Sequence, residues 1–195
     1  MKDKILIGLS GGVDSSVSLK ILKDKGYQVE ALYMKNWDED DYQQGCNAKE
    51  DLEYASDVCN RLNVKLNTAN FSDEYWNKIF TKFLDSYKSG YTPNPDILCN
   101  KYIKFKVFID YAKKLGFDKV ATGHYAKIVK KNNFLYLKVP LDITKDQTYF
   151  LHSLDQKQLS NVIFPLSDIT KQDVKKIAEV NSFKSFNKKE SMGIC

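Results

Sequence analysis

The segment GLSGGVDSS at residues 8–16 constrains the fold more than any other part of the chain. It follows an apolar strand pattern at residues 4–9 and precedes a helical pattern that ends at Gly26. A strand, a tight turn and a helix in this order direct backbone amides and the positive end of the helix dipole toward one point, where an anion binds. Gly11 and Gly12 let the backbone turn sharply and approach a ligand closely. The segment therefore predicts a phosphate-binding loop.

The same segment differs from two common nucleotide-binding motifs. It lacks the lysine of GxxxxGK[ST], and its glycine spacing is not that of GxGxxG. The hydroxyl groups of Ser10, Ser15 and Ser16 are candidate donors, and Asp14 is a candidate ligand for a Mg²⁺ ion that bridges phosphates. The alternative is a glycine-serine turn that caps an ordinary helix and binds nothing.

Strand and helix patterns alternate through most of the chain. Strand patterns lie at residues 4–9, 29–34, 65–71 and 119–122, and helical patterns lie at residues 17–22, 49–62, 73–88 and 101–115. This alternation predicts an α/β fold, with a parallel sheet of four strands, room for a fifth, and flanking helices. Residues 126–139 are predicted to form a hairpin around Asn132 and Asn133, and residues 171–180 a last helix.

Composition excludes several classes of protein. The chain has 195 residues, of which 43% are hydrophobic and 28% charged, so it can bury one sizeable core and is neither disordered nor fibrous. Its formal net charge of +5 permits polyanion binding without requiring it. No apolar stretch approaches the roughly 20 residues that span a bilayer. We expect a cytoplasmic protein with no membrane partner.

The four cysteines have neither the paired spacing of a zinc ribbon nor the density of a disulfide scaffold. Cys59 lies on a helical stripe of apolar residues and is predicted to be a core thiol, whereas Cys46 lies in a polar loop. Cys99 precedes the helix predicted at residues 101–115, where the helix dipole would lower a thiol pKa. The alternative for Cys99 is a small buried hydrophobic side chain.

Six sequence blocks together carry a resemblance to a known family. They are SGGVDS at 10–15, YMKNW at 33–37, TPNPDILCNKYIKF at 92–105, ATGHY at 121–125, KDQTYFL at 145–151 and SMGIC at 191–195. The first resembles the PP-loop ATP pyrophosphatases, and the full set is similar to the tRNA-specific 2-thiouridylases, which place sulfur on C2 of the wobble uridine of tRNA. The resemblance covers about residues 4–195 and implies an adenine nucleotide alpha hydrolase-like fold.

The resemblance implies an ATP-dependent reaction with two stages. Attack of the uridine C2 oxygen on the α-phosphate of ATP converts a poor leaving group into an AMP ester and releases pyrophosphate. Sulfur from a cysteine persulfide then displaces AMP. ATP and Mg²⁺ are the implied cofactors, and tRNA and a persulfide sulfur-donor protein are the implied partners.

The resemblance also assigns roles to individual residues. ATP contacts fall on Gly8, Leu9, Ser10, Gly11, Gly12, Val13, Asp14, Ser15, Met34 and Gly123. Target-base contacts fall on Asn94, Pro95 and Asp96, and tRNA contacts on His124, Lys145, Asp146 and Gln147. Cys99 matches the nucleophile that frees the sulfur by forming a disulfide with Cys195, which matches the persulfide carrier, and Asp96 is a candidate general acid or base.

Several alternatives remain open from the residues themselves. Asn94 to Asp96 also fits a proline-directed turn with an Asx cap, and Asp146 also fits a helix N-cap. His124 also fits a strand end. The nucleophile assignment would fail for a Cys99 thiol that is sealed in the core or lies on the opposite edge from residues 10–15.

The resemblance divides the chain into a PP-loop ATP-binding catalytic domain at residues 1–160 and, at residues 161–195, the beginning of a central domain with a persulfide-bearing tail. The C-terminal β-barrel of the family is absent from these residues. Two other functions stay possible: a different adenylation reaction on the same fold, which needs no thiol pair, or a catalytically silent fragment that binds ATP or RNA.

Overall fold

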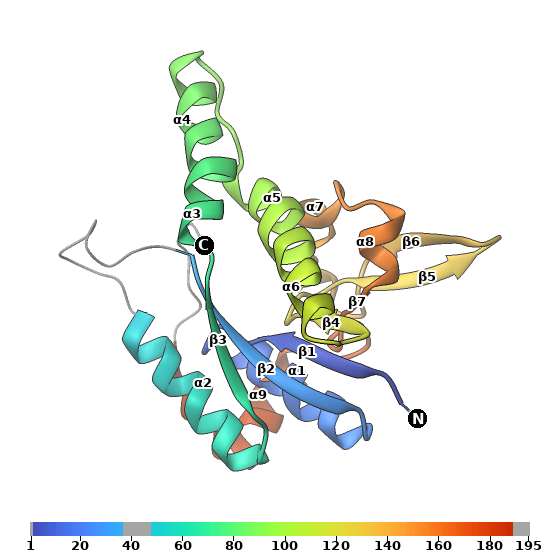
Figure 1. Cartoon of the computed structure of the whole chain (residues 1–195). Coiled ribbons are helices and arrows are strands. Elements are labelled where there is room, and N and C mark those ends of the chain that lie inside the picture. Colours follow the sequence, from blue (N-terminus) through green and yellow to red (C-terminus); the bar gives the residue numbers. More distant parts are fainter. Residues whose placement is uncertain (1, 37–47, 189–195) are drawn as a thin grey trace.

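A five-stranded parallel sheet forms the centre of the molecule (Figure 1). The computed structural model describes residues 2–36 and 48–188. The strand order is β3-β2-β1-β4-β7, with β1 at Lys4–Gly8, β2 at Gln28–Lys35, β3 at Leu66–Asn70, β4 at Lys119–Ala121 and β7 at Val162–Ile163. Every pair of neighbours is parallel. The α/β fold predicted from the alternating patterns is confirmed, and β7 is the fifth strand.

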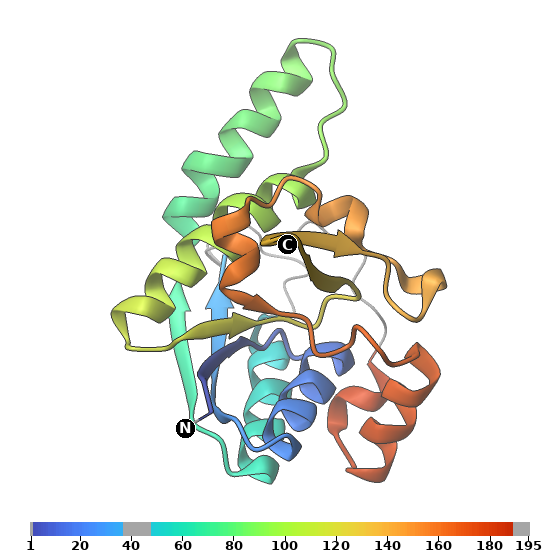
Figure 2. The same cartoon turned by 90° about the vertical axis from the view of Figure 1, so that its right-hand side faces the viewer.

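Helices cover both faces of this sheet (Figure 2). On one face lie α1 (Val13–Asp24), α2 (Ala48–Leu62) and α9 (Lys171–Val180), whose buried side chains share one apolar cluster with Ile5 and Ile7 of β1. On the other face a continuous helical stretch runs through α5 (Pro95–Cys99), η3 (Asn100–Val107) and α6 (Phe108–Lys114), and packs with Leu6 in a second cluster. The carboxyl ends of the parallel strands therefore lie at one edge, between the two helical layers.

A long helical arm extends away from the sheet (Figure 1). It consists of α3 (Ser72–Tyr75), the π-helical segment η2 (Trp76–Phe80) and α4 (Thr81–Lys88). None of the residues of α4 is buried. The rings of Phe80, Phe83 and Tyr87 stack in succession along it, with centroids 6.4 and 6.1 Å apart. The predicted helix at residues 73–88 is confirmed as this arm.

A two-stranded antiparallel sheet lies beside the main sheet. Its strands are β5 (Lys127–Lys131) and β6 (Phe134–Lys138), and the connecting Asn132 and Asn133 have φ of 47° and 66°. Positive φ at both central positions is typical of the tight turn that matches the twist of a hairpin, and asparagine tolerates it. The hairpin predicted at residues 126–139 is confirmed.

Short elements not expected from the sequence follow the hairpin. They are η4 (Ile143–Lys145), α7 (Thr148–Leu151), α8 (Gln156–Ser160) and, after α9, η5 (Lys184–Asn187).

Because β7 pairs with β4 and α9 packs in the same cluster as α1, a cut at the boundary between residues 160 and 161 would divide the sheet and its core. That domain boundary stays a prediction. Among the described residues, no helix is long and apolar enough to cross a membrane.

Candidate functional site

The loop between β1 and α1 has the geometry of an anion cradle. Helix α1 begins at Val13, and its N-cap, Gly12, is extended at φ −84° and ψ 160° and contributes no side-chain cap. The first-turn amides of such a helix are left for a ligand. The hydroxyl of Ser15 accepts from the amide of Ser10 at 3.3 Å and donates to the carbonyl of Gly12 at 3.0 Å. The loop is therefore held in shape by its own serine.

Gly11 has a backbone that no other residue fits. Its φ is +74°, and a Cβ built there would lie 2.4 Å from the carbonyl oxygen of Asp51 in α2. A side chain at position 11 would clash with backbone that cannot swing away. The glycine thus allows the loop to pack directly against the first turn of α2.

Three further positions assigned to ATP contacts meet at this loop. A Cβ built on Gly8 would lie 3.0 Å from Cε of Met34, and one built on Gly123 would lie 2.7 Å from the amide nitrogen of Ser15. Gly8 ends β1, Met34 lies near the end of β2, and Gly123 follows β4. The structure therefore brings these residues together at the carboxyl edge of the sheet. Their roles toward ATP stay predictions.

Asp14 carries a partner that the sequence did not indicate. The ammonium of Lys171, at the start of α9, lies 2.7 and 2.8 Å from its two carboxylate oxygens, and the hydroxyl of Tyr125 donates to Oδ1 at 3.0 Å. The side chain of Lys171 is only 10% exposed. A charge this well sheltered interacts strongly with its partner. Lys171 therefore supplies a cation next to the loop, whose own motif contains no lysine.

This pairing bears on the predicted magnesium ligand. Both oxygens of Asp14 contact the ammonium of Lys171, and the described residues include no group of three or more His, Cys, Asp or Glu side chains that could hold a metal ion. The donor set does not fit a resident metal ion. Magnesium at Asp14 stays a prediction, for a cation that arrives with the phosphates of a nucleotide.

The position of Cys99 corrects the prediction made for its helix. The helix begins at Pro95 and not near residue 101, because Asn94 caps it and proline fits its first position. Cys99 is the fifth helical residue, beyond the exposed amides of the first turn. Its side chain is 0% exposed, within the apolar cluster that also holds Ile103. The argument that a helix end activates this thiol is therefore wrong, and in this conformation the sealed thiol cannot act as a nucleophile.

The other cysteines divide between the core and the part of the chain that the structure does not describe. Cys59 is 2% exposed, and burial raises its pKa to about 11, which confirms the prediction of a core thiol. Neither Cys59 nor Cys99 forms a disulfide with a described cysteine. Cys46 and Cys195 lie outside the described residues, so the pairing of Cys99 with Cys195 stays a prediction.

The turn before Cys99 has the structure of a helix cap. The side-chain oxygen of Asn94 accepts from the amide of Asp96 at 3.0 Å, and Pro95 occupies the first helical position. This geometry confirms the Asx-cap interpretation. Contact of Asn94, Pro95 and Asp96 with a base, and acid or base chemistry at Asp96, stay predictions.

His124 lies between aromatic rings. Its ring centroid is 5.7 Å from that of Phe105 and 6.1 Å from that of Phe164, and its Nδ1 is hydrogen-bonded to Thr122 Oγ1 at 2.8 Å. Burial, with the nearby charge of Lys104, lowers the pKa of His124 to about 3. The imidazole is therefore neutral at physiological pH. A tRNA contact by His124 stays a prediction and would be a hydrogen bond, not an ion pair with phosphate.

The segment that contains Lys145, Asp146 and Gln147 is connected to the loop by Tyr125, whose hydroxyl donates to Asp14. Gln147 accepts from the amide of Tyr125 at 2.9 Å and its own amide donates to the carbonyl of Tyr125 at 3.0 Å. Asp146 accepts from the amide and hydroxyl of Thr148, the first residue of α7, both at 3.0 Å. Asp146 is the residue before the N-cap of α7, which is Gln147, so the alternative that made Asp146 itself the N-cap is wrong. The tRNA contacts of the segment stay predictions.

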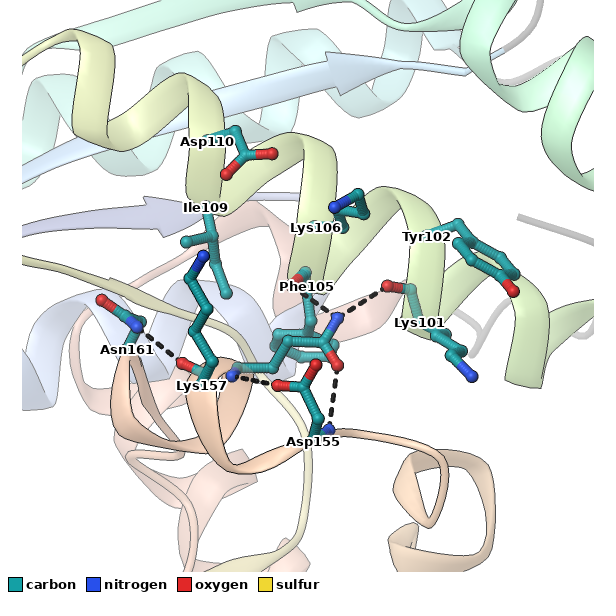
Figure 3. Close-up of a pocket in the computed structure, with 10 residues that line it drawn as sticks. Lys101, Tyr102, Phe105, Lys106, Ile109, Asp110, Asp155, Lys157 and Asn161 are labelled. Atoms are coloured by element: carbon teal, nitrogen blue, oxygen red, sulfur yellow. Dashed lines mark hydrogen bonds between the residues drawn. The ribbon is translucent and has the colours of Figure 1, made fainter.

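A separate pocket of about 250 Å³ opens between the η3–α6 helix and α8 (Figure 3). Its charged lining residues are Lys101, Lys106, Asp110, Asp155 and Lys157. Between them, Nε2 of Gln158 donates to the carbonyl oxygens of Lys101 and Phe105, each at 2.9 Å. None of the residues assigned to ATP, base or tRNA contacts lines this pocket. It is distinct from the candidate site.

Comparisons with known proteins agree with these features. The family model described as the tRNA methyl transferase HUP domain matches residues 3–195. The chain is 58% identical over 192 residues to the tRNA-specific 2-thiouridylase MnmA of Vesicomyosocius okutanii, covering 98% of this chain and 53% of that protein. It is 52% identical to the protein of the same name in Stutzerimonas stutzeri, covering 100% of this chain and 52% of that protein. The chain thus spans about half the length of these curated relatives.

Solved structures share the fold at low sequence identity. A 4-thiouridine synthetase in complex with RNA and bound ATP superimposes with a TM-score of 0.65 at 18% identity, covering 99% of this chain and 44% of that chain. The U34-tRNA thiolase NcsA of Methanococcus maripaludis gives a TM-score of 0.60 at 20% identity, covering 100% of this chain and 62% of that chain. At such identities the likeness concerns the fold alone. The match over residues 3–195 shows that this chain belongs to the family of the tRNA methyl transferase HUP domain, and its curated relatives in that comparison are named tRNA-specific 2-thiouridylase.

Proposed function

We propose that this chain is the catalytic part of an enzyme that thiolates C2 of the wobble uridine of tRNA at the expense of ATP. The supporting observation is the convergence of Gly8, Met34 and Gly123 on the anion cradle, in a chain that is 58% identical to a curated tRNA-specific 2-thiouridylase. A cradle alone would fit any nucleotide. The names of the curated relatives support tRNA as the substrate.

The described residues suit the first stage of this reaction. The amides at the start of α1 would bind the triphosphate of ATP, with magnesium supplying additional charge neutralisation on the phosphates. Asp14 by itself would repel a phosphate, but the ammonium of Lys171 offsets its charge. The uridine C2 oxygen attacks the α-phosphorus, the bond to the β-phosphate oxygen breaks, and pyrophosphate leaves with that electron pair. Uridine is then bound as an AMP ester.

The second stage requires a sulfur nucleophile. A persulfide on Cys195 would supply its outer sulfur, Cys99 would attack the inner one, and the two cysteines would end as a disulfide while AMP leaves C2. Because Cys99 is 0% exposed, this stage requires that the elements packed over α5 move away from it when tRNA binds. Helix α5 packs against the arm segment η2 and against α7, so either of these can uncover it by moving.

Mass analysis of tRNA nucleosides tests the proposal. Incubation of tRNA with the chain, ATP, magnesium and a persulfide donor should yield 2-thiouridine with equal amounts of AMP and pyrophosphate. Cys99→Ser should still accept labelled persulfide but fail to pass it to tRNA, and Cys195→Ser should accept none. Thiolation by both variants would remove the thiols from the mechanism.

A second function is favoured by one observation. The sealed thiol of Cys99 also fits a protein that binds ATP and RNA without catalysis. In that case ATP and tRNA would bind, and neither AMP nor pyrophosphate would form. The same incubation separates the two functions.

A further inference from the structure

Two hydrogen-bonded routes connect the segment at residues 142–147 to Asp14 of the loop. In the first route, Oδ2 of Asp142 accepts from the backbone amide of Lys171 at 2.9 Å. The ammonium of that same lysine binds both carboxylate oxygens of Asp14. The amide of Lys171 is the main cause that lowers the pKa of Asp142, followed by the Thr144 hydroxyl. Asp142 is therefore an ionised acceptor that fixes the first residue of α9.

The second route runs through Tyr125. Gln147 binds both backbone groups of this residue, its side chain accepting at 2.9 Å and its amide donating at 3.0 Å. Tyr125 is 1% exposed, and its hydroxyl donates to Oδ1 of Asp14 at 3.0 Å. Two backbone hydrogen bonds fix the backbone of Tyr125, and the packing of its buried ring fixes where the hydroxyl lies. Gln147 therefore fixes the second donor to Asp14, just as Asp142 fixes the first.

The outer side of the segment is accessible while its two ends are bound. Ile143 is 73% exposed, and Lys145 lies between the two anchoring residues. A ligand can therefore contact the segment without displacing Asp142 or Gln147 from their partners. Hydrogen bonds weaken steeply when the angle at the donor hydrogen falls below about 120°. A small displacement of the segment would consequently change how well Lys171 and Tyr125 bind the carboxylate of Asp14, and so the charge that this carboxylate carries at the loop.

We propose that Asp142 and Gln147 are positioning residues for the ATP step, because they hold Lys171 and Tyr125 on Asp14. We further infer that tRNA bound to the outer side of this segment and ATP bound to the loop strengthen one another. The second part rests on the proposed function, whereas the first rests on the hydrogen bonds alone. Because coupling between two binding sites is reciprocal, it can be measured from either ligand.

Binding of Mg-ATP without tRNA tests the positioning role. Calorimetry should show that Asp142→Ala weakens ATP binding about tenfold, the scale of a lost hydrogen bond to a charged group. Asp142 caps the short helix η4, and Asp155 caps the short helix α8 in the same way but makes no contact that leads to Asp14, so Asp155→Ala is the matched control. It should bind ATP as the unmodified chain does, with a similar loss of thermal stability.

Conservative variants separate positioning from mere stability. Tyr125→Phe removes only the hydroxyl on Asp14, and it should weaken ATP binding with the ring still packed. Gln147→Glu keeps the oxygen that accepts from Tyr125, so it should restore the affinity that Gln147→Ala loses. ATP affinities equal to that of the unmodified chain in both Asp142→Ala and Tyr125→Phe would overturn the positioning role.

A titration with a tRNA transcript tests the coupling at fixed salt concentration. Saturating tRNA should raise the ATP affinity of the unmodified chain, and this gain should vanish in Asp142→Ala and Tyr125→Phe while tRNA still binds. If tRNA binds and the ATP affinity does not change, the coupling is wrong and the proposed function stands. If tRNA does not bind at all, the proposed function and the coupling both fail, and the tRNA-free titration alone decides the positioning role.

Discussion

At the scale of single residues, the ion pair between Asp14 and Lys171 decides the charge of the candidate site. A carboxylate beside helix amides competes with a phosphate for the same donors, and an ammonium at 2.7 Å removes that disadvantage. Lys171 was missed because 156 residues separate it from Asp14 in the sequence. Its helix could be predicted, but the layer on which that helix packs could not.

Replacement of Lys171 should therefore weaken nucleotide binding. Lys171→Met keeps the length and apolar stem of the side chain but leaves Asp14 uncompensated, and we expect a loss of at least about tenfold in Mg-ATP affinity. Isothermal titration measures it. Lys175→Met, an exposed position on the same helix, is the control and should bind ATP normally. Equal Mg-ATP affinity in the two variants would show that the ammonium of Lys171 takes no part in nucleotide binding.

The lowered pKa of His124 predicts a dependence of stability on pH. Burial lowers the pKa of the folded imidazole to about 3, whereas the ordinary pKa of a histidine side chain is 6.5. Between these values the unfolded chain binds the extra proton, so acidification below about pH 6.5 should lower the free energy of unfolding, by at most about 1.4 kcal/mol per pH unit. Denaturant unfolding of the chain and of His124→Gln at a series of pH values measures this. A slope that persists in the variant would assign it to other groups.

At the scale of elements, the helix that carries Cys99 shows where local patterns mislead. The apolar spacing from residue 101 onward predicted a helix start there, but Asn94 and Pro95 provide a stronger start signal. The hairpin and the helix at residues 171–180 were predictable because positive φ at two asparagines and a threonine cap are local properties. Burial of a thiol by a neighbouring helix is not local, so the sequence could not indicate it.

The accessibility of Cys99 should therefore depend on bound tRNA. Without tRNA, alkylation of Cys99 should be much slower than that of an exposed thiol, because the reagent must wait for an opening of the core. With tRNA and ATP bound, the rate should rise. Mass spectrometry of the peptide that contains Cys99 measures both, and Cys59, equally buried on the other face, is the internal control. Acceleration at both cysteines would indicate general loosening instead of a local opening.

At the scale of the whole molecule, residues after 160 complete the core on which the site depends. Val174 and Ala178 are 0% exposed and Phe183 is 2% exposed, and all pack in the cluster beneath α1. Burial of the larger two, Val174 and Phe183, contributes about 1.5–3 kcal/mol each. Their sum is a large part of the roughly 5–15 kcal/mol that stabilises an ordinary domain.

A chain ending at residue 160 should consequently lose cooperative folding. It would lack β7, α9 and the ammonium of Lys171, and calorimetry should show no sharp unfolding transition. A chain ending at residue 188 is the matched comparison and should melt cooperatively. A sharp transition in the shorter chain would instead support a domain boundary between residues 160 and 161.

The exposed arm is a place where a protease can cut the chain into two pieces. No residue of α4 is buried, Gly90 has nothing within 4 Å of where a side chain would stand, and Tyr91 is 71% exposed. Protease therefore has its best access to the backbone there. A cut after Lys88 would leave Gly8 and Met34 in one piece and Gly123 and Lys171 in the other. The two pieces should stay associated through the shared sheet, so mixing separately purified halves should restore ATP binding that neither half shows alone.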